Sequence, residues 1–234
     1  MTNQDIESER DPASTRQREL LARLAAIDCC AVSDALDASG LPPAVTGLIP
    51  LSARRRIVGT AVTVKLEPVS SGGGTGRHLG TAAVEEADED NIVVVEHLSR
   101  DDCAGWGGIL STGASLKGIP GVVIDGSARD IDEAISLEFP IYGRKGVAVT
   151  ALRRVRETGF NEQVCIGGVC VAPGDYVIAD SSGVAFVPAK HIDTVLARAE
   201  NIAAKERRMV DDVRRGRPIT EVMGENYEKM LDTL

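Results

Sequence analysis

Strands and helices alternate in the middle of the chain, and this alternation constrains the fold more than any other feature. Residues 92–95 and 122–124 are short, continuous apolar runs, typical of strands buried on both faces. Residues 107–116 and 131–137 have helical patterning, and a further strand begins near residue 141. Strand, helix, strand, helix, strand at this spacing predicts βαβ units and a parallel sheet.

The segments before this core predict further elements. Apolar residues at helical spacing predict helices over 20–27 and 31–38. Residues 57–66 alternate and are β-branched, which predicts a strand. A glycine stretch then leads to a helix expected over 77–86. The first part of the chain is therefore also mixed α and β.

The pattern changes after Thr150. Short β segments over 164–166, 169–171, 176–179 and 184–187 alternate with turns, which indicates an antiparallel unit. A long charged helix is expected over 191–215, with a shorter one after it. No linker rich in Pro or Ser separates these parts. We therefore expect one domain over 19–234, preceded by a flexible N-terminal arm over 1–18.

Composition excludes several classes of protein. The formal charge is −9 and aromatic residues are 3 % of the chain, which argues against a protein that follows phosphate backbones or stacks on bases. No apolar run approaches the roughly 18 residues of a membrane span. The arm has no apolar centre of the kind found in secretory signals. We expect a cytoplasmic protein that binds neither nucleic acid nor membrane.

The spacing of the cysteines and histidines indicates which metal ions the protein could bind. The five cysteines show no CxxC pair, and the three histidines form no HxxxH pattern. The thiols are expected to be reduced and mostly buried. Any metal would be held by oxygen ligands, which favours a hard ion such as Mg²⁺ or Mn²⁺.

The first candidate loop contains Gly107 and Gly108 and opens a helix directly after a buried strand. Open α/β sheets bind ligands at the carboxyl ends of their strands. Backbone N–H groups at a helix N-terminus favour an anion, so a carboxylate or phosphate could bind there without a cationic side chain. Alternatively, the glycines only permit a tight turn. The residues alone leave both interpretations open.

The second candidate loop contains Arg129 and Asp130, after the strand at 122–124. Arg129 could hold a carbonyl or carboxylate oxygen, and Asp130 could bind a divalent ion. However, Asp130 and Glu133 also fit a D-x-x-E capping box, in which Asp130 only begins a helix. The two roles are compatible, because a carboxylate has two oxygens.

Other candidates carry weaker signals. Lys65 and Lys117 are not expected beside the Arg129 loop, which disfavours a Schiff-base aldolase. Arg77 and His78 follow the glycine stretch and could either cap a substrate or begin a helix.

Several of these motifs together resemble one known signature, that of the family of 4-hydroxy-4-methyl-2-oxoglutarate aldolase and the regulator of ribonuclease E activity A. The motifs are Val32-Ser33-Asp34-Ala35-Leu36, Gly59-Thr60-Ala61-Val62-Thr63-Val64, Trp106-Gly107-Gly108-Ile109-Leu110, Gly118-Ile119-Pro120-Gly121 with Val122-Val123-Ile124-Asp125-Gly126, Arg129-Asp130, Val171-Ala172-Pro173-Gly174-Asp175 and Ala179-Asp180-Ser181-Ser182-Gly183-Val184. The resemblance covers roughly residues 20–215 in the same order. Members are often labelled demethylmenaquinone methyltransferases, but no GxGxxG pattern supports that label here.

The resemblance implies a fold and an assembly. It implies an α/β protein with a swivelling β/β/α domain, mixed sheets, and helical N- and C-terminal extensions. It also implies a homotrimer, or a hexamer formed as a dimer of trimers, with the active site between subunits.

The resemblance also implies site residues. The backbone amides of Gly107, Gly108, Ile109 and Leu110 would bind the carboxylate of a small 2-oxo acid. Arg129 would contact the 2-oxo oxygen, and Asp130 would bind Mg²⁺ (or Mn²⁺), largely through waters. A glutamate from the neighbouring subunit's C-terminal helix would lie near the ion, and Glu206 is its best match.

One departure from the family pattern concerns position 108. The aldolases have an acidic residue 21 positions before the arginine, where this chain has Gly108. The ion would therefore lose one negative charge from its surroundings, although the glycine keeps its N–H.

The functional expectation is a class II, divalent-metal-dependent lyase. It would cleave a carbon–carbon bond of a small 2-oxo acid, by retro-aldol cleavage of a 4-hydroxy-2-oxo acid to pyruvate, by oxaloacetate decarboxylation, or by both. The alternative is a non-catalytic regulatory binding protein similar to the ribonuclease E regulator. Arg129 and Asp130 favour the enzyme, and Gly108 favours the regulator.

Overall fold

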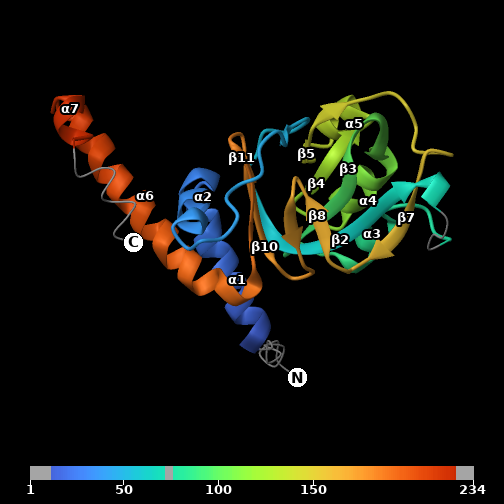
Figure 1. Ribbon diagram of the computed structural model, residues 1–234, viewed down its shortest axis with the longest axis horizontal. Coiled ribbons are helices and arrows are strands. Elements are labelled where there is room, and N and C mark those ends of the chain that lie inside the picture. The colour runs from blue at the N-terminus through green and yellow to red at the C-terminus, as the bar shows by residue number, and fades with distance from the viewer. Residues whose placement is uncertain (1–11, 72–75, 225–234) are drawn as a thin grey trace, which may run out of the picture.

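A mixed sheet with helices around it forms the body of the molecule (Figure 1). The structure is a computed structural model that describes residues 12–71 and 76–224. The helices are α1 (Pro12–Ala25), α2 (Cys29–Asp37), α3 (Thr81–Glu86), α4 (Gly108–Leu116), α5 (Ile131–Ser136), α6 (Ile192–Arg214) and α7 (Ile219–Val222). The strands are β1 (Ile49–Pro50), β2 (Ile57–Pro68), β3 (Asn91–Trp106), β4 (Val122–Ala128), β5 (Ile141–Gly143), β6 (Lys145–Gly146), β7 (Val155–Phe160), β8 (Val164–Ile166), β9 (Val169–Val171), β10 (Tyr176–Asp180) and β11 (Gly183–Val187).

The predicted parallel sheet is confirmed at the centre of this body. Within the described residues, nine strands pair in one sheet, with the main order β1-β5-β4-β3-β2-β10-β11. The pairs β2–β3, β3–β4 and β4–β5 are parallel, whereas β10 and β11 add antiparallel strands. β4 is buried along its whole length, because helices and other strands cover both of its faces. The α/β class with mixed sheets, in the swivelling β/β/α arrangement, is confirmed.

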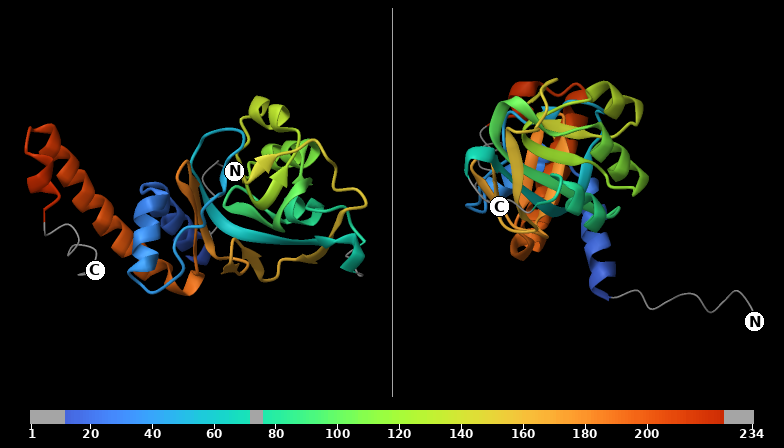
Figure 2. Two further views of the ribbon diagram at one scale, coloured as in Figure 1. Left: turned by 45° about the horizontal axis from the view of Figure 1, so that its top comes forward. Right: turned by 90° about the vertical axis from the view of Figure 1, so that its right-hand side faces the viewer.

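Three groups of elements pack against the sheet. Helices α3, α4 and α5 cover one face and pack against β2, β3 and β4. The β8–β9 hairpin packs on the other face, against β3 and β4. Helices α1, α2 and α6 pack together against β10 and β11, at the end of the sheet that these two strands form (Figure 2). The last turns of α6 project away from the body, and they form the expected C-terminal helical extension (Figure 1).

Two strands differ from the sequence-based expectation. β3 continues well past the expected 92–95 run to Trp106, with register shifts against β4. Leu98 and Ser99 both have positive φ there, so the chain bulges before it rejoins the ladder. β7 was not expected at all, although it pairs antiparallel with β2. Its polar side chains hide the alternation of buried and half-buried positions.

Two helices begin at other residues than expected. α3 begins at Thr81, not at residue 77. α1 begins at Pro12, so residues 12–18 of the expected arm are helical, and residues 1–11 lie outside the described part of the chain. Arg16 forms an ion pair with Asp193, and Arg18 forms one with Asp90. These pairs hold the helix start against the body, which composition could not show. None of the helices in the described ranges is long and apolar enough to span a membrane.

Candidate functional site

The two candidate loops meet at the carboxyl ends of β3 and β4. Because these strands are adjacent and parallel, their carboxyl ends lie at the same edge of the sheet. The N–H of Arg129 donates to the carbonyl of Trp106 at 3.0 Å, which ties the loop after β4 to the end of β3. The expectation that Gly107–Gly108 and Arg129–Asp130 lie together is therefore confirmed.

Trp106 anchors the start of α4. Its side chain is buried, stacks on Phe139 at a centroid distance of 6.4 Å, and donates from Nε1 to Ser111 Oγ at 2.9 Å. Ser111 Oγ in turn donates to the carbonyl of Gly107 at 3.2 Å. The first turn of α4 is thus held rigidly, and its amide groups have fixed directions.

Asp130 occupies the N-cap position of α5, but its carboxylate makes no capping hydrogen bond. Instead, the N–H of Gly108 donates to Asp130 Oδ2 at 2.9 Å. Arg129 Nε donates to both carboxylate oxygens, at 3.2 and 3.1 Å. The backbone of Asp130 is left-handed, with φ 57° and ψ 42°, which turns the side chain away from its own helix. The capping-box alternative is therefore wrong for the side chain of Asp130.

Glu133 lies directly over Gly108. A Cβ atom added at Gly108 would lie 1.9 Å from Glu133 Oε2 and 3.2 Å from Asp130 Cβ. The carboxylate of Glu133 thus occupies the space that a side chain at position 108 would take. The chain lacks an acid at position 108, yet α5 supplies one at the same place. The sequence pattern suggests only a capping-box role for Glu133, because Gly108 is 25 residues away from it in the chain.

The residues of the first turn of α4 line a pocket. The first N–H groups of a helix have no intrahelical acceptor. Among the described residues, the structure gives the N–H groups of Gly107, Ile109 and Leu110 no acceptor, whereas that of Gly108 binds Asp130. Three of the four expected amides are therefore available to an anion. The fourth orients the Asp130 carboxylate.

The pocket has a volume of about 180 Å³, which suits a small organic acid. Arg129 and Asp130 line it together with the start of α4. Its other sides come from two segments that the sequence did not connect to the site, and their lining residues are His78, Leu79, Thr150 and Ala151. His78 had been considered as a substrate cap, whereas no signal in the sequence identified Thr150 or Ala151.

A buried glutamate on β7 holds one of these segments. Glu157 is 1 % exposed and accepts a hydrogen bond from the N–H of Gly80 at 2.8 Å. Arg77 lies 3.8 Å from the same carboxylate and 5.5 Å from the ring centroid of Phe160. The segment that carries His78 is therefore fixed to the strand beside the pocket.

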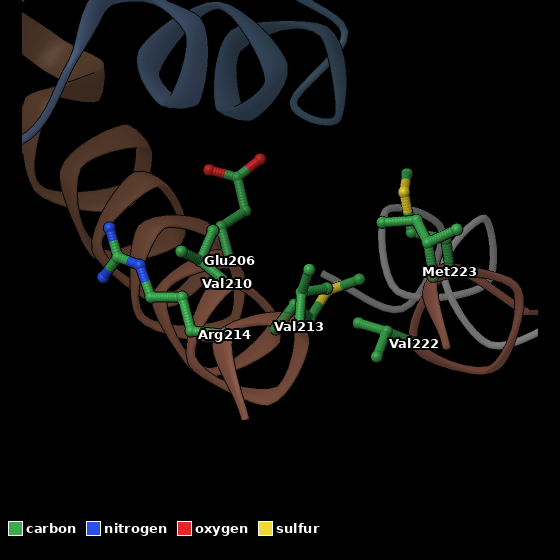
Figure 3. Close-up of a pocket in the computed structure, with 8 residues that line it drawn as sticks. Glu206, Val210, Val213, Arg214, Val222 and Met223 are labelled. Carbon is green, nitrogen blue, oxygen red and sulfur yellow. The ribbon is translucent and has the colours of Figure 1, made fainter. Parts of the chain in front are cut away.

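Glu206 does not lie in this pocket within one chain. It is half-buried on α6, at the opposite end of the molecule from α4 and α5 (Figure 1). There it lines a separate apolar hollow of about 370 Å³ between α6 and α7, beside Val210 and Val213 (Figure 3). Burial, together with the negative charges of Asp28 and Asp34, raises the pKa of Glu206. The predicted position of Glu206 near the ion therefore requires that it reach the pocket of a second subunit.

The donor set at the pocket suits a hard divalent ion. Asp130 and Glu133 both offer carboxylate oxygens beside Gly108. No group of three or more His, Cys, Asp or Glu side chains that could enclose a metal occurs in residues 12–71 and 76–224. Mg²⁺ is commonly held by one or two carboxylates and completes its shell with waters and substrate oxygens. The two carboxylates therefore fit a hard ion such as Mg²⁺ or Mn²⁺.

Comparison with known proteins identifies the family. The family model described as RraA-like: Aldolase/RraA matches residues 29–186, which include both loops of the pocket. The chain belongs to the RraA-like family. The resemblance seen in the sequence motifs is thereby confirmed.

Individual relatives of this RraA-like protein differ in name and in length. A Halalkalibacterium halodurans protein named "Putative 4-hydroxy-4-methyl-2-oxoglutarate aldolase" is 30 % identical over 217 residues, which cover 90 % of this chain and 98 % of the relative. Protein DlpA of Legionella pneumophila is 28 % identical over 190 residues, and the match covers 81 % of this chain but only 31 % of DlpA.

A solved structure agrees in fold. The crystal structure of RraAS2 from Streptomyces coelicolor, described as an unusual member of the RNase ES inhibitor RraA protein family, has a TM-score of 0.74. It is 24 % identical and covers 81 % of this chain and 95 % of its own. At this identity the likeness concerns the fold alone.

Proposed function

We propose that this RraA-like protein is a class II lyase that depends on a divalent metal and cleaves a carbon–carbon bond of a small 2-oxo acid. The observation that carries the proposal is the orientation of Asp130. Its carboxylate leaves the helix cap, accepts the N–H of Gly108, and lies beside Arg129, where both residues line the pocket. A purely structural aspartate at this position would cap α5 instead.

The substrate carboxylate would bind at the N-terminus of α4. The N–H groups of Gly107, Ile109 and Leu110 are available there, and the partial positive charge of the helix end favours an anion. The guanidinium of Arg129 would then face the 2-oxo oxygen of the same molecule. A 2-oxo acid presents these two groups side by side, and the start of α4 and Arg129 line the same pocket.

We propose that the ion is Mg²⁺ or Mn²⁺ and that Asp130 holds it, with the carboxylate of Glu133 adding negative charge beside it. When bound, the ion would supply Lewis-acid polarisation of the 2-oxo group. Arg129 would stabilise the negative charge that develops on the same oxygen as the bond breaks. Glu133 would supply the charge that the family places at position 108, so Gly108 is compatible with catalysis.

Two reactions require that negative charge on the 2-oxo oxygen be stabilised. In retro-aldol cleavage of a 4-hydroxy-2-oxo acid, a base removes the C4 hydroxyl proton, C4 becomes a carbonyl carbon, and the C3–C4 bond breaks so that its electrons form the enolate of pyruvate. In decarboxylation of oxaloacetate, loss of carbon dioxide leaves the same enolate. Arg129 and the α4 amides would contact only the pyruvate half that both substrates share, so one pocket could serve both.

We also propose a homotrimer, or a hexamer built from two trimers. Val210, Val213, Ile219 and Met223 form an apolar face at the end of α6 and α7, with 46, 38, 55 and 48 % of their respective surfaces exposed (Figure 3). Assembly would cover this face and could bring Glu206 of the partner subunit to the pocket. Light scattering should give three or six times the chain mass of 24.7 kDa, and a monomeric mass at micromolar concentration would contradict the assembly.

The decisive experiment measures pyruvate release from 4-hydroxy-4-methyl-2-oxoglutarate and from oxaloacetate. Turnover is expected with Mg²⁺ or Mn²⁺, and it should disappear with EDTA and return when the metal is restored. Undiminished turnover after exhaustive chelation would refute metal dependence. Absence of turnover on a panel of 2-oxo acids would favour the alternative, a regulatory binding protein like the RraA members of the family.

A further inference from the structure

Two exposed cysteines lie opposite each other on the β8–β9 hairpin. The strands are joined by Gly167 and Gly168, whose φ angles are 56° and 88°. Two successive residues with positive φ form the two-residue turn that fixes the register of a tight hairpin. In this register, Cys165 pairs directly with Cys170.

The two thiols are on the same face of the hairpin. Directly opposed residues of an antiparallel pair point to one face, and their Cα atoms lie about 4.5 to 5.5 Å apart. Disulfides require Cα separations of about 4.4 to 6.8 Å, so the pair lies within range. Val164, Ile166 and Val171 are buried on the other face, which leaves Cys165 and Cys170 exposed to solvent.

The hairpin is fixed by hydrogen bonds to the central sheet. The N–H of Cys165 donates to Glu96 Oε2 at 2.9 Å, and the N–H of Gly167 donates to Asp125 Oδ2 at 2.8 Å. Glu96 and Asp125 belong to β3 and β4, and both are buried. The register that opposes the cysteines is therefore held by the core as well as by the turn.

The other three cysteines have different surroundings. Cys29 and Cys103 are buried, but three of the five cysteines are exposed, so the expectation of mostly buried thiols is wrong. Burial raises the pKa of the Cys29 thiol to about 12. Cys30 is exposed, but it lies on helix α2 and has no cysteine on an opposing strand. Cys30 is thus a matched control, because it has similar access to solvent without a partner.

We propose that Cys165 and Cys170 form a reversible thiol–disulfide site that reacts with small disulfides such as oxidised glutathione. The thiolate of one cysteine attacks a sulfur of the small disulfide, which releases one small thiolate and leaves a mixed disulfide. The thiolate of the second cysteine then attacks the first cysteine's sulfur and releases the second small thiolate. The two cysteines are oxidised, the small disulfide is reduced to two thiols, and these take up the two cysteine protons.

The test uses the native, fully reduced protein incubated with oxidised glutathione. Trypsin should release residues 157–190 as one peptide, which contains Cys165 and Cys170 and no other cysteine. The expected product is this peptide lighter by two hydrogen atoms, resistant to alkylation until a reductant is added. Of the three exposed thiols in the native protein, two should be lost.

Variants separate this result from general thiol reactivity. Cys30→Ser should form the same cross-link, and Cys165→Ser should accumulate a stable glutathione adduct on Cys170. The proposal is overturned if the wild-type peptide carries glutathione on both cysteines, or if both remain open to alkylation. Pyruvate release plays no part in this readout, so the result is independent of the proposed lyase function.

Discussion

Replacing Asp130 by Asn separates a metal ligand from a structural aspartate. Asn has nearly the same shape, tolerates the left-handed backbone found at this position, and keeps an oxygen that can accept the N–H of Gly108. The change therefore removes the charge and little else. If Asp130 holds the ion, folding should survive and catalysis should not.

The structure sets the size of the effect on folding. The hydrogen bond from Gly108 loses its charge-assisted part, which is worth about 1 kcal/mol. The ion pair with Arg129 joins side chains that are 39 and 34 % exposed, so solvent screens it and its loss costs less than about 1 kcal/mol. A total near 1 kcal/mol lowers the melting temperature of a chain this size by about 2 to 4 °C. We expect a shift of this order in the metal-free protein.

The effect on turnover should be much larger. Loss of an ion that stabilises developing charge is worth several kcal/mol, so turnover should fall by at least about 100-fold. The assay is pyruvate release by Asp130→Asn at saturating Mg²⁺, beside a thermal melt of the metal-free protein. Asp132→Asn is the matched control, since it removes an exposed acid from the same helix and should leave both quantities unchanged. Near-full turnover of Asp130→Asn, on a substrate that the parent protein cleaves, would refute the assignment.

Three further changes test the neighbours of this carboxylate and one buried histidine. Arg129→Lys keeps the charge but loses the planar fork, so steady-state kinetics should show turnover reduced by about 10-fold or more, and unchanged kinetics would contradict a role in orienting the 2-oxo group. Glu133→Ala should weaken Mg²⁺ binding about 10-fold in calorimetry, and adding Gly108→Asp, which then has room for its side chain, should restore it; equal affinity in Glu133→Ala and the parent would exclude Glu133. Burial lowers the pKa of His97 below 6.5 in the folded state, so the unfolded state takes up the proton first and stability is lost as the pH falls below about 6.5. Thermal melts from pH 7.5 to 5.5 should therefore show a flatter loss of stability in His97→Gln than in the parent, and parallel curves would argue against this origin.

Most of the architecture follows from local patterning of the sequence. The apolar runs that became the cores of β3 and β4 are too short for helices and too apolar for exposed strands, so only buried strands suit them. Parallel strands place their carboxyl ends at one edge, so the meeting of Gly107 with Arg129 could be predicted without coordinates. Residues with less distinct patterns could not be placed in this way. β7, with its polar side chains, became a strand only because β2 offered it a partner.

The site shows most clearly which features the sequence determines and which ones the tertiary structure decides. The sequence by itself determined which residue types stand at the ends of adjacent strands, and hence that a carboxylate, a guanidinium and free amides share one edge of the sheet. It could not determine whether Asp130 caps α5 or binds Gly108, because the backbone N–H donors at both places suit a carboxylate acceptor. Nor could it place Glu133 over Gly108, since that neighbour comes from the packing of α4 beside α5. Tertiary contacts decided these side-chain partners, because a hydrogen bond depends on distances of a few ångströms that no local periodicity specifies.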